Sequence, residues 1–432
     1  MKNVKTGVVL LALLLAAMAM VPFVGATGQN ATTAPADNFA TATVDVSKIQ
    51  QPLLTFDKTQ NPVTVNNEMT LDQTTTNLQP ATLAAAASSP DAVKIPYGVI
   101  IRHSADGMTT VFDSTGKQLF SASDAKAAII NTPNGPARAT HIQEVPDRSV
   151  IVDAGQKMYV FKDKALIMTV IDEASPKRDA VLAAAASTYP SQYIEGTETN
   201  VLPSIGQFIA RWNVPKSPAM ISPYPADGNP YKGSQVTIWN GVFGYVGSDP
   251  YSRLLQPVLE WYKKDKISDP NPTTGAWTMA TWYLNSGLVP DLVHSTRRTL
   301  VYSGDNMQGN IQTNTLGYDA IASIADLGPQ GGGSSTLFLA KTTYPHRMPG
   351  TNVQATVVLE GWDPTILPGL NGQYLCGSTT FQNFVLNDAK GNNILSTPMN
   401  TFTNPTYWNP TTFGLGVTNN WPSSIKLNTI NN

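Results

Sequence analysis

The chain has 432 residues and a formal net charge of -2, and 13% of its residues are charged. It contains no block of lysine and arginine long enough to hold a phosphate backbone, which excludes nucleic acid as an expected partner. The 32 glycines and 32 prolines, with abundant Thr, Asn and Ser, suit many strands and turns better than long helices. This composition predicts an all-β protein.

Residues 1–26 have the pattern of a secretory signal peptide. Lys2 and Lys5 precede an apolar run, and Val24–Ala26 supplies the small residues preferred at a cleavage site. The run is shorter than the roughly 20 residues that a spanning helix needs, although a retained N-terminal anchor stays an alternative. We expect a secreted, extracellular protein with no membrane contact unless this segment is kept.

The next two segments differ in their capacity to fold. Residues 27–91 are rich in Thr, Ala, Gln, Asn and Pro with few aromatics, which predicts a low-complexity, extended segment. Residues 92–174 alternate short apolar runs with turn dipeptides such as Asp106-Gly107 and Thr115-Gly116. They predict a small antiparallel β domain.

A repeated hexapeptide, LAAAAS, brackets this small domain at Leu83–Ser88 and at Leu182–Ser187. The second copy lies in a predicted linker, residues 175–195. Exposed loops of small residues are favoured sites of proteolytic cutting. We therefore weigh two interpretations of residues 27–190: a pro-segment that is cut away, and a permanent accessory module.

Residues 196–432 carry a dense series of strand-like runs separated by turn residues. They include SIGQFIARWNVP, SQVTIWNGVFGYVG, LLQPVLEW, GAWTMATWYLNSG and NVQATVVLEGW. This series predicts a jelly roll or β-sandwich, which buries one face of each strand and leaves another face for a ligand.

The run LLQPVLEW is the most informative of these. As a strand it places Gln256, Val258 and Glu260 on one face, and Leu255 and Leu259 on the other. Such a polar stripe is most often the wetted side of a half-buried sheet. The alternative is that it carries chemistry, and the neighbouring segments favour that alternative.

Six segments, taken in order, resemble the glutamic peptidases (eqolisins), secreted proteases with a concanavalin-like β-sandwich. GQFIARWNVP is similar to their opening strand, IWNGVFG to their Trp-x-Gly strand, and LLQPVLEW to the strand with the catalytic glutamine. ATWYLNSG resembles the following aromatic strand, SGDNMQGNI a Gly-Asp turn, and VVLEGW the segment with the catalytic glutamate. The resemblance covers about residues 204–390.

This resemblance implies roles for individual residues. Gln256 matches the catalytic glutamine, Glu360 the catalytic glutamate, and Trp239 the active-site tryptophan. Glu260 stands where the family has an acidic neighbour of the cleft. Phe243 stands where the family has an aspartate, a departure that removes part of the expected hydrogen-bond network.

The implied chemistry is also consistent without the family. A carboxylate such as Glu360 can take a proton from water, and an amide such as Gln256 can stabilise the tetrahedral oxyanion. Trp239, Trp282 and Trp362 are the aromatic residues we assign to substrate binding, with Trp239 and Trp362 expected to bury the glutamate partly and raise its pKa. We expect a peptide or protein substrate, an acid to weakly acid pH optimum and no cofactor.

Other catalytic chemistries have weak support. The four histidines, His103, His141, His294 and His346, are far apart in the sequence and form no HExxH motif, so we predict no metal site and interpret each as a surface or turn residue. The single cysteine, Cys376, has no catalytic partners in view and is predicted to lie in the core.

Two non-catalytic functions remain as alternatives. A jelly roll can hold carbohydrate against stacked aromatic rings, here Trp261, Trp277, Trp282, Tyr283 and Trp362. A surface structural or adhesion protein fits the flanks rich in Thr, Asn and Pro.

Overall fold

The fold is seen in a computed structural model, which describes part of the chain. The residues described are 80–83, 94–127, 129–133, 135–153, 157–173, 192–218, 235–245, 252–262, 276–285, 291–295, 298–315, 318–330, 332–340, 352–362, 376–404 and 415–429. The predicted signal peptide, the second LAAAAS copy and His346 lie outside these residues. Within them, no helix has the length and apolar character needed to cross a membrane.

The first of two large sheets is 11-stranded and carries the residues singled out above. From one edge to the other its strands are β2 (Lys94–Pro96), β1 (Pro80–Leu83), β8 (Ile142–Val145), β17 (Asp291–Ser295), β16 (Ala276–Asn285), β15 (Ser252–Tyr262), β14 (Gln235–Tyr245), β22 (Asn352–Trp362), β12 (Gln192–Thr199) and β24 (Met399–Asn404), with β18 (Arg298–Val301) beside β16.

The second large sheet is 13-stranded. Its strands are, in order, β25 (Gly416–Asn420), β26 (Ser424–Asn428), β23 (Thr379–Asn387), β13 (Gln207–Asn213), β19 (Asn306–Thr315), β20 (Tyr318–Asp326), β21 (Gly333–Ala340), β9 (Ser149–Asp153), β10 (Lys157–Lys162), β11 (Ala165–Asp172), β3 (Val99–His103), β4 (Met108–Phe112) and β5 (Gln118–Ser123). A separate pair, β6 (Ile129–Thr132) and β7 (Gly135–Arg138), and two 3₁₀ turns, η5 (Asp124–Lys126) and η6 (Ala139–His141), complete the described elements.

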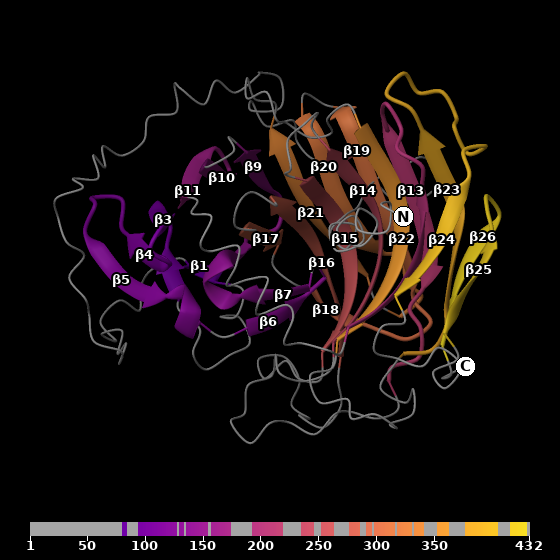
Figure 1. Ribbon diagram of the computed structural model, residues 1–432, viewed down its shortest axis with the longest axis horizontal. Coiled ribbons are helices and arrows are strands. Elements are labelled where there is room, and N and C mark those ends of the chain that lie inside the picture. The colour runs from indigo at the N-terminus through magenta and orange to yellow at the C-terminus, as the bar shows by residue number, and fades with distance from the viewer. Residues whose placement is uncertain are drawn as a thin grey trace, which may run out of the picture.

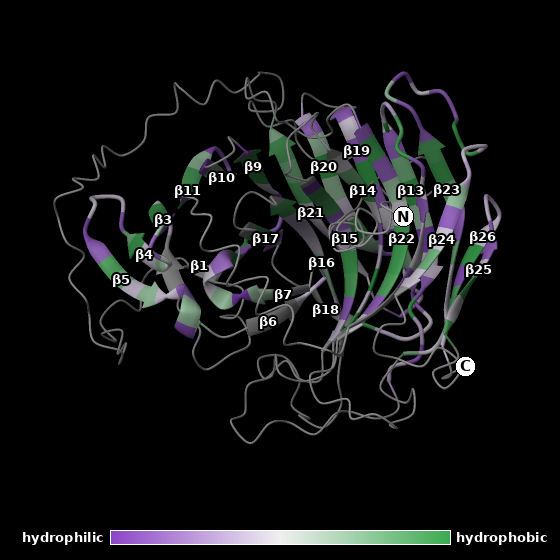
Figure 2. Ribbon diagram, viewed as in Figure 1, coloured by the Kyte–Doolittle hydropathy of each residue, from purple (hydrophilic) through white to green (hydrophobic). Residues whose placement is uncertain are grey.

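The two sheets pack face to face, as the alternating sequence pattern requires. Strands β14, β15 and β16 lie against β19, β20 and β21 (Figure 1). Hydrophobic residues dominate the middle of strands such as β20 (Figure 2), and from Ala320 onward the residues of β20 alternate between buried and half-buried positions. The predicted all-β sandwich is confirmed.

The strands of residues 94–172 do not form a closed domain of their own. They lie at one end of the molecule (Figure 1), where β8 pairs with β17 and β9 pairs with β21, both in parallel. The pairing of β11 with β3 is also parallel, so the expected purely antiparallel arrangement is wrong. Both large sheets therefore run from the sandwich into this N-terminal unit.

Buried contacts reinforce this continuity. Val99 and Ile151 of the N-terminal unit belong to the same hydrophobic core as Ile238 and Leu255 of the sandwich. Asp153 at the end of β9 accepts a hydrogen bond of 2.8 Å from Arg253 of β15 and another from the hydroxyl of Tyr283. This buried ion pair, with the Tyr283 hydroxyl as a third partner, joins the N-terminal unit to the sandwich. Removing either charge of such a pair lowers the stability of the fold, because the other charge is left buried.

The predicted segment boundaries differ slightly from those observed. Strand β12 begins at Gln192, inside the segment expected to be a linker up to residue 195. Strand β1 falls within the stretch expected to be extended, and Leu83, the first residue of the first LAAAAS copy, is its last residue. Strand pairing with β2 and β8 explains this difference, because a short polar segment adopts a strand when an edge is available.

Candidate functional site

One contact between the sheets decides which way the side chains of β14 and β15 point. An added Cβ at Gly309 of β19 would meet the side chains of Asn240 and Pro257, so these two residues face the second sheet. Because strand residues alternate between faces, their neighbours Trp239 and Gln256 point away from it. We call this outward side of strands β14, β15, β16 and β22 the site face.

The predicted faces of LLQPVLEW follow from this alternation. Gln256, Val258 and Glu260 belong to the site face, and Leu255 and Leu259 face the second sheet. Both faces are buried rather than one being wet, since all five side chains are 0% exposed. A merely solvated polar stripe is therefore not the explanation of Gln256 and Glu260.

Glu360 lies in a cross-strand row with Thr237 and Glu260, because Thr237 of β14 pairs with both glutamates. Its Oε2 accepts hydrogen bonds from the Thr237 hydroxyl at 3.1 Å and from the Trp239 indole N–H at 3.3 Å. Burial raises the pKa of Glu360 well above its ordinary value, against the lowering effect of these two hydrogen bonds. Burial was expected to raise this pKa and does so, whereas the hydrogen bond from Trp239, which was not expected, lowers it.

Glu260 is held in a similar way from the other side. The indole N–H of Trp282, on β16, donates a hydrogen bond to Glu260 Oε1. The Trp282 ring stacks on His294 of β17, with ring centroids 4.4 Å apart. The imidazole of His294 lies 4.0 Å from the carboxylate of Glu144, on β8 of the N-terminal unit. Each of the two glutamates in this row is thus oriented by a tryptophan.

Gln256 occupies a different row. Trp239 of β14 pairs with Val258 of β15, and Val242 pairs with Leu255. The register of the two strands does not change between these pairs. Gln256 therefore lies opposite Gly241. Gly241 in turn pairs with Thr356 of β22. As a glycine, Gly241 contributes no side chain between the Gln256 amide and the Thr356 hydroxyl, which are both buried.

Several polar atoms of this face have no hydrogen-bond partner among the described residues. They are Nε2 and Oε1 of Gln256, the hydroxyl of Thr356 and Oε1 of Glu360. A buried polar group without a partner is costly, and native proteins rarely keep one without a reason. These four atoms are available to a polar ligand. Polar atoms without a partner among the described residues also lie on the inward side of the same strands, at Asn240, Trp261 and Trp277.

The structure does not bring Gln256 and Glu360 into direct contact. They lie two strands and four residues apart in register, which places their α carbons about 16 Å from each other on standard strand spacings. Trp239 occupies the midpoint between them on β14. The two residues share a face, and Glu360 is closer to Glu260, about 10 Å away in the same row.

Sequence reasoning missed three polar residues of the site face. Thr237 and Thr356 lie on β14 and β22, and Glu198 of β12 pairs with Thr356. Burial raises the pKa of Glu198 to about 7. Only the strand pairing identifies these residues, because none belongs to a motif. The side chain of Trp362 lies outside the described residues.

The aromatic residues proposed for a carbohydrate platform are divided between two faces. All four described residues are buried, but Trp261, Trp277 and Tyr283 lie in register with the inward side of β15, whereas Trp282 lies in register with the site face. A continuous aromatic platform of these residues is therefore not formed.

The histidines were interpreted as surface or turn residues; the three that the structure describes are not on the surface, although His141 does lie in a turn, η6. His103, His141 and His294 are 0%, 2% and 0% exposed. His103 and His141, which are distant in the sequence, stack on each other in the N-terminal unit. Cys376 is buried in the core, as predicted, and burial raises the pKa of its thiol.

Neither a comparison with models of known protein families nor a comparison with curated proteins finds a match for this chain.

Proposed function

We propose that the protein is an exported peptidase of the glutamic type, in which Glu360 is the general base and acid and Gln256 stabilises the oxyanion. The observation that carries the proposal is the site face itself. It combines a buried carboxyl of raised pKa, Glu360, with a buried amide whose polar atoms have no partner among the described residues. A carboxyl of perturbed pKa and unsatisfied polar atoms that share one face are features found at catalytic sites.

Gln256 and Glu360 are 0% exposed, so a substrate reaches them only when the chain that covers the site face moves away. It would then lie over Trp239, between the two catalytic groups. Gly241 presents no side chain to a peptide backbone that approaches β14 beside Gln256.

The steps use only groups on this face. Ionised Glu360 accepts a proton from water, the water oxygen attacks the peptide carbonyl carbon, and the Gln256 N–H donates to the resulting oxyanion. The protonated Glu360 then donates its proton to the leaving nitrogen as the C–N bond breaks. The products are a carboxyl and an amine, and Glu360 returns to its starting state.

The raised pKa of Glu360 sets the direction of the pH dependence. A general base acts in its ionised form, so activity rises with pH as Glu360 loses its proton. Because burial raises this pKa, the rising part of the profile lies above the ordinary glutamate range near 4.3. We propose a weakly acid optimum rather than a strongly acid one.

The test is hydrolysis of a denatured protein substrate by the full secreted chain across acid and weakly acid pH. We expect Glu360→Gln to reduce kcat by about 10²-fold to 10⁴-fold and Gln256→Ala by about 10²-fold to 10³-fold, with folding retained by circular dichroism. Phe208→Leu, a change in the core strand β13, is the control for general damage. Wild-type activity in both site variants would refute the proposal, and binding of immobilised glycans unaffected by Glu360→Gln would favour the carbohydrate-binding alternative.

A further inference from the structure

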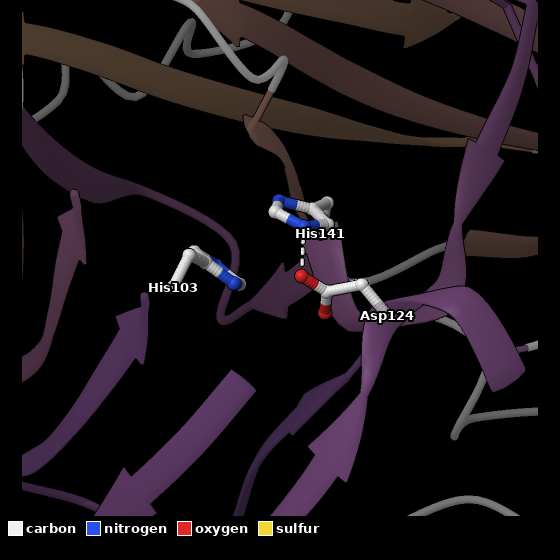
Figure 3. Close-up of side chains that lie close together, drawn as sticks. All are labelled: His103, Asp124 and His141. Carbon is white, nitrogen blue, oxygen red and sulfur yellow. Dashed lines mark ion pairs between the residues drawn. The ribbon is translucent and has the colours of Figure 1, made fainter. Parts of the chain in front are cut away.

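A second cluster of chemically active side chains lies in the N-terminal unit, away from the site face. His103 ends strand β3, Asp124 begins the turn η5, and His141 ends the turn η6. Figure 3 shows the two imidazoles and the carboxyl turned toward one another from these three elements. The three residues span 38 positions of the sequence, from 103 to 141.

The geometry of the cluster is compact. One ligand atom from each residue lies within 4.8 Å of the others, and Nε2 of His141 is 3.5 Å from Oδ2 of Asp124. Two ligands of one tetrahedral zinc ion, each about 2.1 Å from the metal, lie about 3.4 Å apart. The His141–Asp124 distance already has this value, and the largest separation requires a shift of little more than 1 Å.

The hydrogen bonds of Thr109 prepare His103 for such a role. The Thr109 hydroxyl donates its one proton to Asp124 Oδ1, so its oxygen is left to accept from His103 Nδ1 at 2.8 Å. This arrangement fixes the proton of the neutral imidazole on Nδ1. Nε2 then carries the lone pair that a metal ligand needs, the arrangement usual for metal-binding histidines.

We propose that His103, Asp124 and His141 bind one divalent first-row metal ion, with zinc as the best match. Two imidazole nitrogens and one carboxylate oxygen form a common zinc ligand set, and water completes the tetrahedron. The cluster is also almost fully buried, at 0%, 6% and 2% exposure for the three side chains. Three protein ligands and one water are the pattern of catalytic zinc sites, but burial closes this site to a substrate, which leaves stabilisation of the fold as the role of the ion.

The position of the cluster shows what such an ion would join. The cluster joins two regions of the chain. His103 and Asp124 lie at the end of β3 and in the turn η5, which follows β5, and both strands belong to the second sheet. His141 lies in η6, which leads directly into β8. β8 is the strand that joins the first sheet by pairing with β17. A metal at this point therefore stabilises the crossing of the chain from one large sheet to the other.

The test is titration of the chelator-treated full chain with Zn²⁺ by calorimetry, together with native mass spectrometry and thermal unfolding. We expect one Zn²⁺ per chain and a higher Tm with the ion. Asp124→Asn and His141→Gln should abolish stoichiometric binding. His294→Gln, which changes a buried histidine outside the cluster, should bind as the wild type does.

A subtler variant covers the case in which ligand variants fail to fold. Thr109→Val keeps all three ligands and removes the hydroxyl that orients His103, so Zn²⁺ affinity should fall by about 10-fold to 100-fold. The proposal is overturned if the wild-type chain binds no stoichiometric Zn²⁺. It is equally overturned if the Asp124→Asn/His141→Gln double variant binds the ion as tightly as the wild type.

Discussion

Glu360 on the site face and Asp124 in the N-terminal unit are both buried carboxyls, yet their pKa values move in opposite directions. Burial raises the pKa of Glu360 well above the ordinary value. Burial also acts to raise the pKa of Asp124, but the hydrogen bond and charge of His141, with the Thr109 hydrogen bond and the charge of His103, lower it to about 2. Both carboxyls accept hydrogen bonds, so the number of donors is not the difference.

The difference lies in whether the donors can carry charge. Glu360 accepts from a threonine hydroxyl and an indole, which are neutral at all relevant pH values. Asp124 faces two imidazoles, which can become cationic. A neutral donor offsets only part of the desolvation cost, whereas a cationic partner favours the ionised form outright. The first environment keeps a proton available for transfer, and the second holds a fixed negative charge.

The largest expected effect on stability comes from a third buried carboxyl, that of Asp153. Its partner is an arginine, which is charged at every relevant pH. Asp153 pairs with Arg253 at 2.8 Å, and the side chains are 9% and 2% exposed. We expect Asp153→Ala to lower the free energy of unfolding by about 3 to 5 kcal/mol, because it leaves Arg253 buried without this counter-charge. Denaturant unfolding measures the change.

The matched control is the half-exposed pair of Arg102 and Glu173, at 2.7 Å. Glu173→Ala should cost less than about 1 kcal/mol, since solvent screens this pair. If the Asp153 and Glu173 variants lose equal stability, burial does not set the strength of these ion pairs.

The next effect concerns Asp124 in chelator-treated protein. A pKa lowered from 3.8 to about 2 means that the folded state binds this proton less tightly than the unfolded state. The carboxylate therefore contributes roughly 2 kcal/mol of stability above pH 4, which is lost as the pH falls toward 2. Asp124→Asn should remove this contribution and flatten that part of the stability profile.

Unfolding followed between pH 2 and 6 tests this expectation. Asp106→Asn, which changes an exposed turn carboxyl of the same unit, should alter stability by no more than about 0.5 kcal/mol. An Asp124→Asn protein with the same acid sensitivity as the wild type would contradict the role given to the histidines.

The smallest effect comes from the hydrogen bond between Trp239 and Glu360. Trp239→Phe keeps an aromatic ring and removes the N–H that favours the carboxylate, so the pKa of Glu360 should rise further. The rising limb of kcat/KM against pH should move upward by the same amount. The control is Trp212→Phe, which removes a buried indole of the second sheet and should leave the rising part of the pH profile unchanged. If both variants shift the profile equally, the hydrogen bond from Trp239 to Glu360 does not cause the shift.

Much of the site face follows from local sequence, because side chains alternate along a strand. The faces of Gln256, Glu260 and Leu255 were predictable from spacing alone. The contacts between strands were not predictable. Thr237 joins the row of Glu360 only through the pairing of β14 with β22, which connects residues more than 100 positions apart.

The N-terminal unit illustrates the same limit. Its turns and short strands were visible in the sequence, but its parallel attachment to β17 and β21 depends on edges supplied by distant segments. The meeting of His103, Asp124 and His141 likewise needs a strand end and two turns to converge, and no fixed spacing in the sequence indicates it. Motif searches find metal sites whose ligands share one helix or loop, and this cluster has neither.

The protonation state of Glu360 is the most direct test of this account. Infrared difference spectra between the wild type and Glu360→Gln, recorded as the pH is raised, isolate the carboxyl band of this one residue. We predict that the band of the protonated acid persists well above pH 4.3, about the ordinary glutamate pKa, and is lost only at higher pH. A band that disappears at or below this ordinary value would contradict the account, because Glu360 would then hold no proton to donate in the weakly acid range.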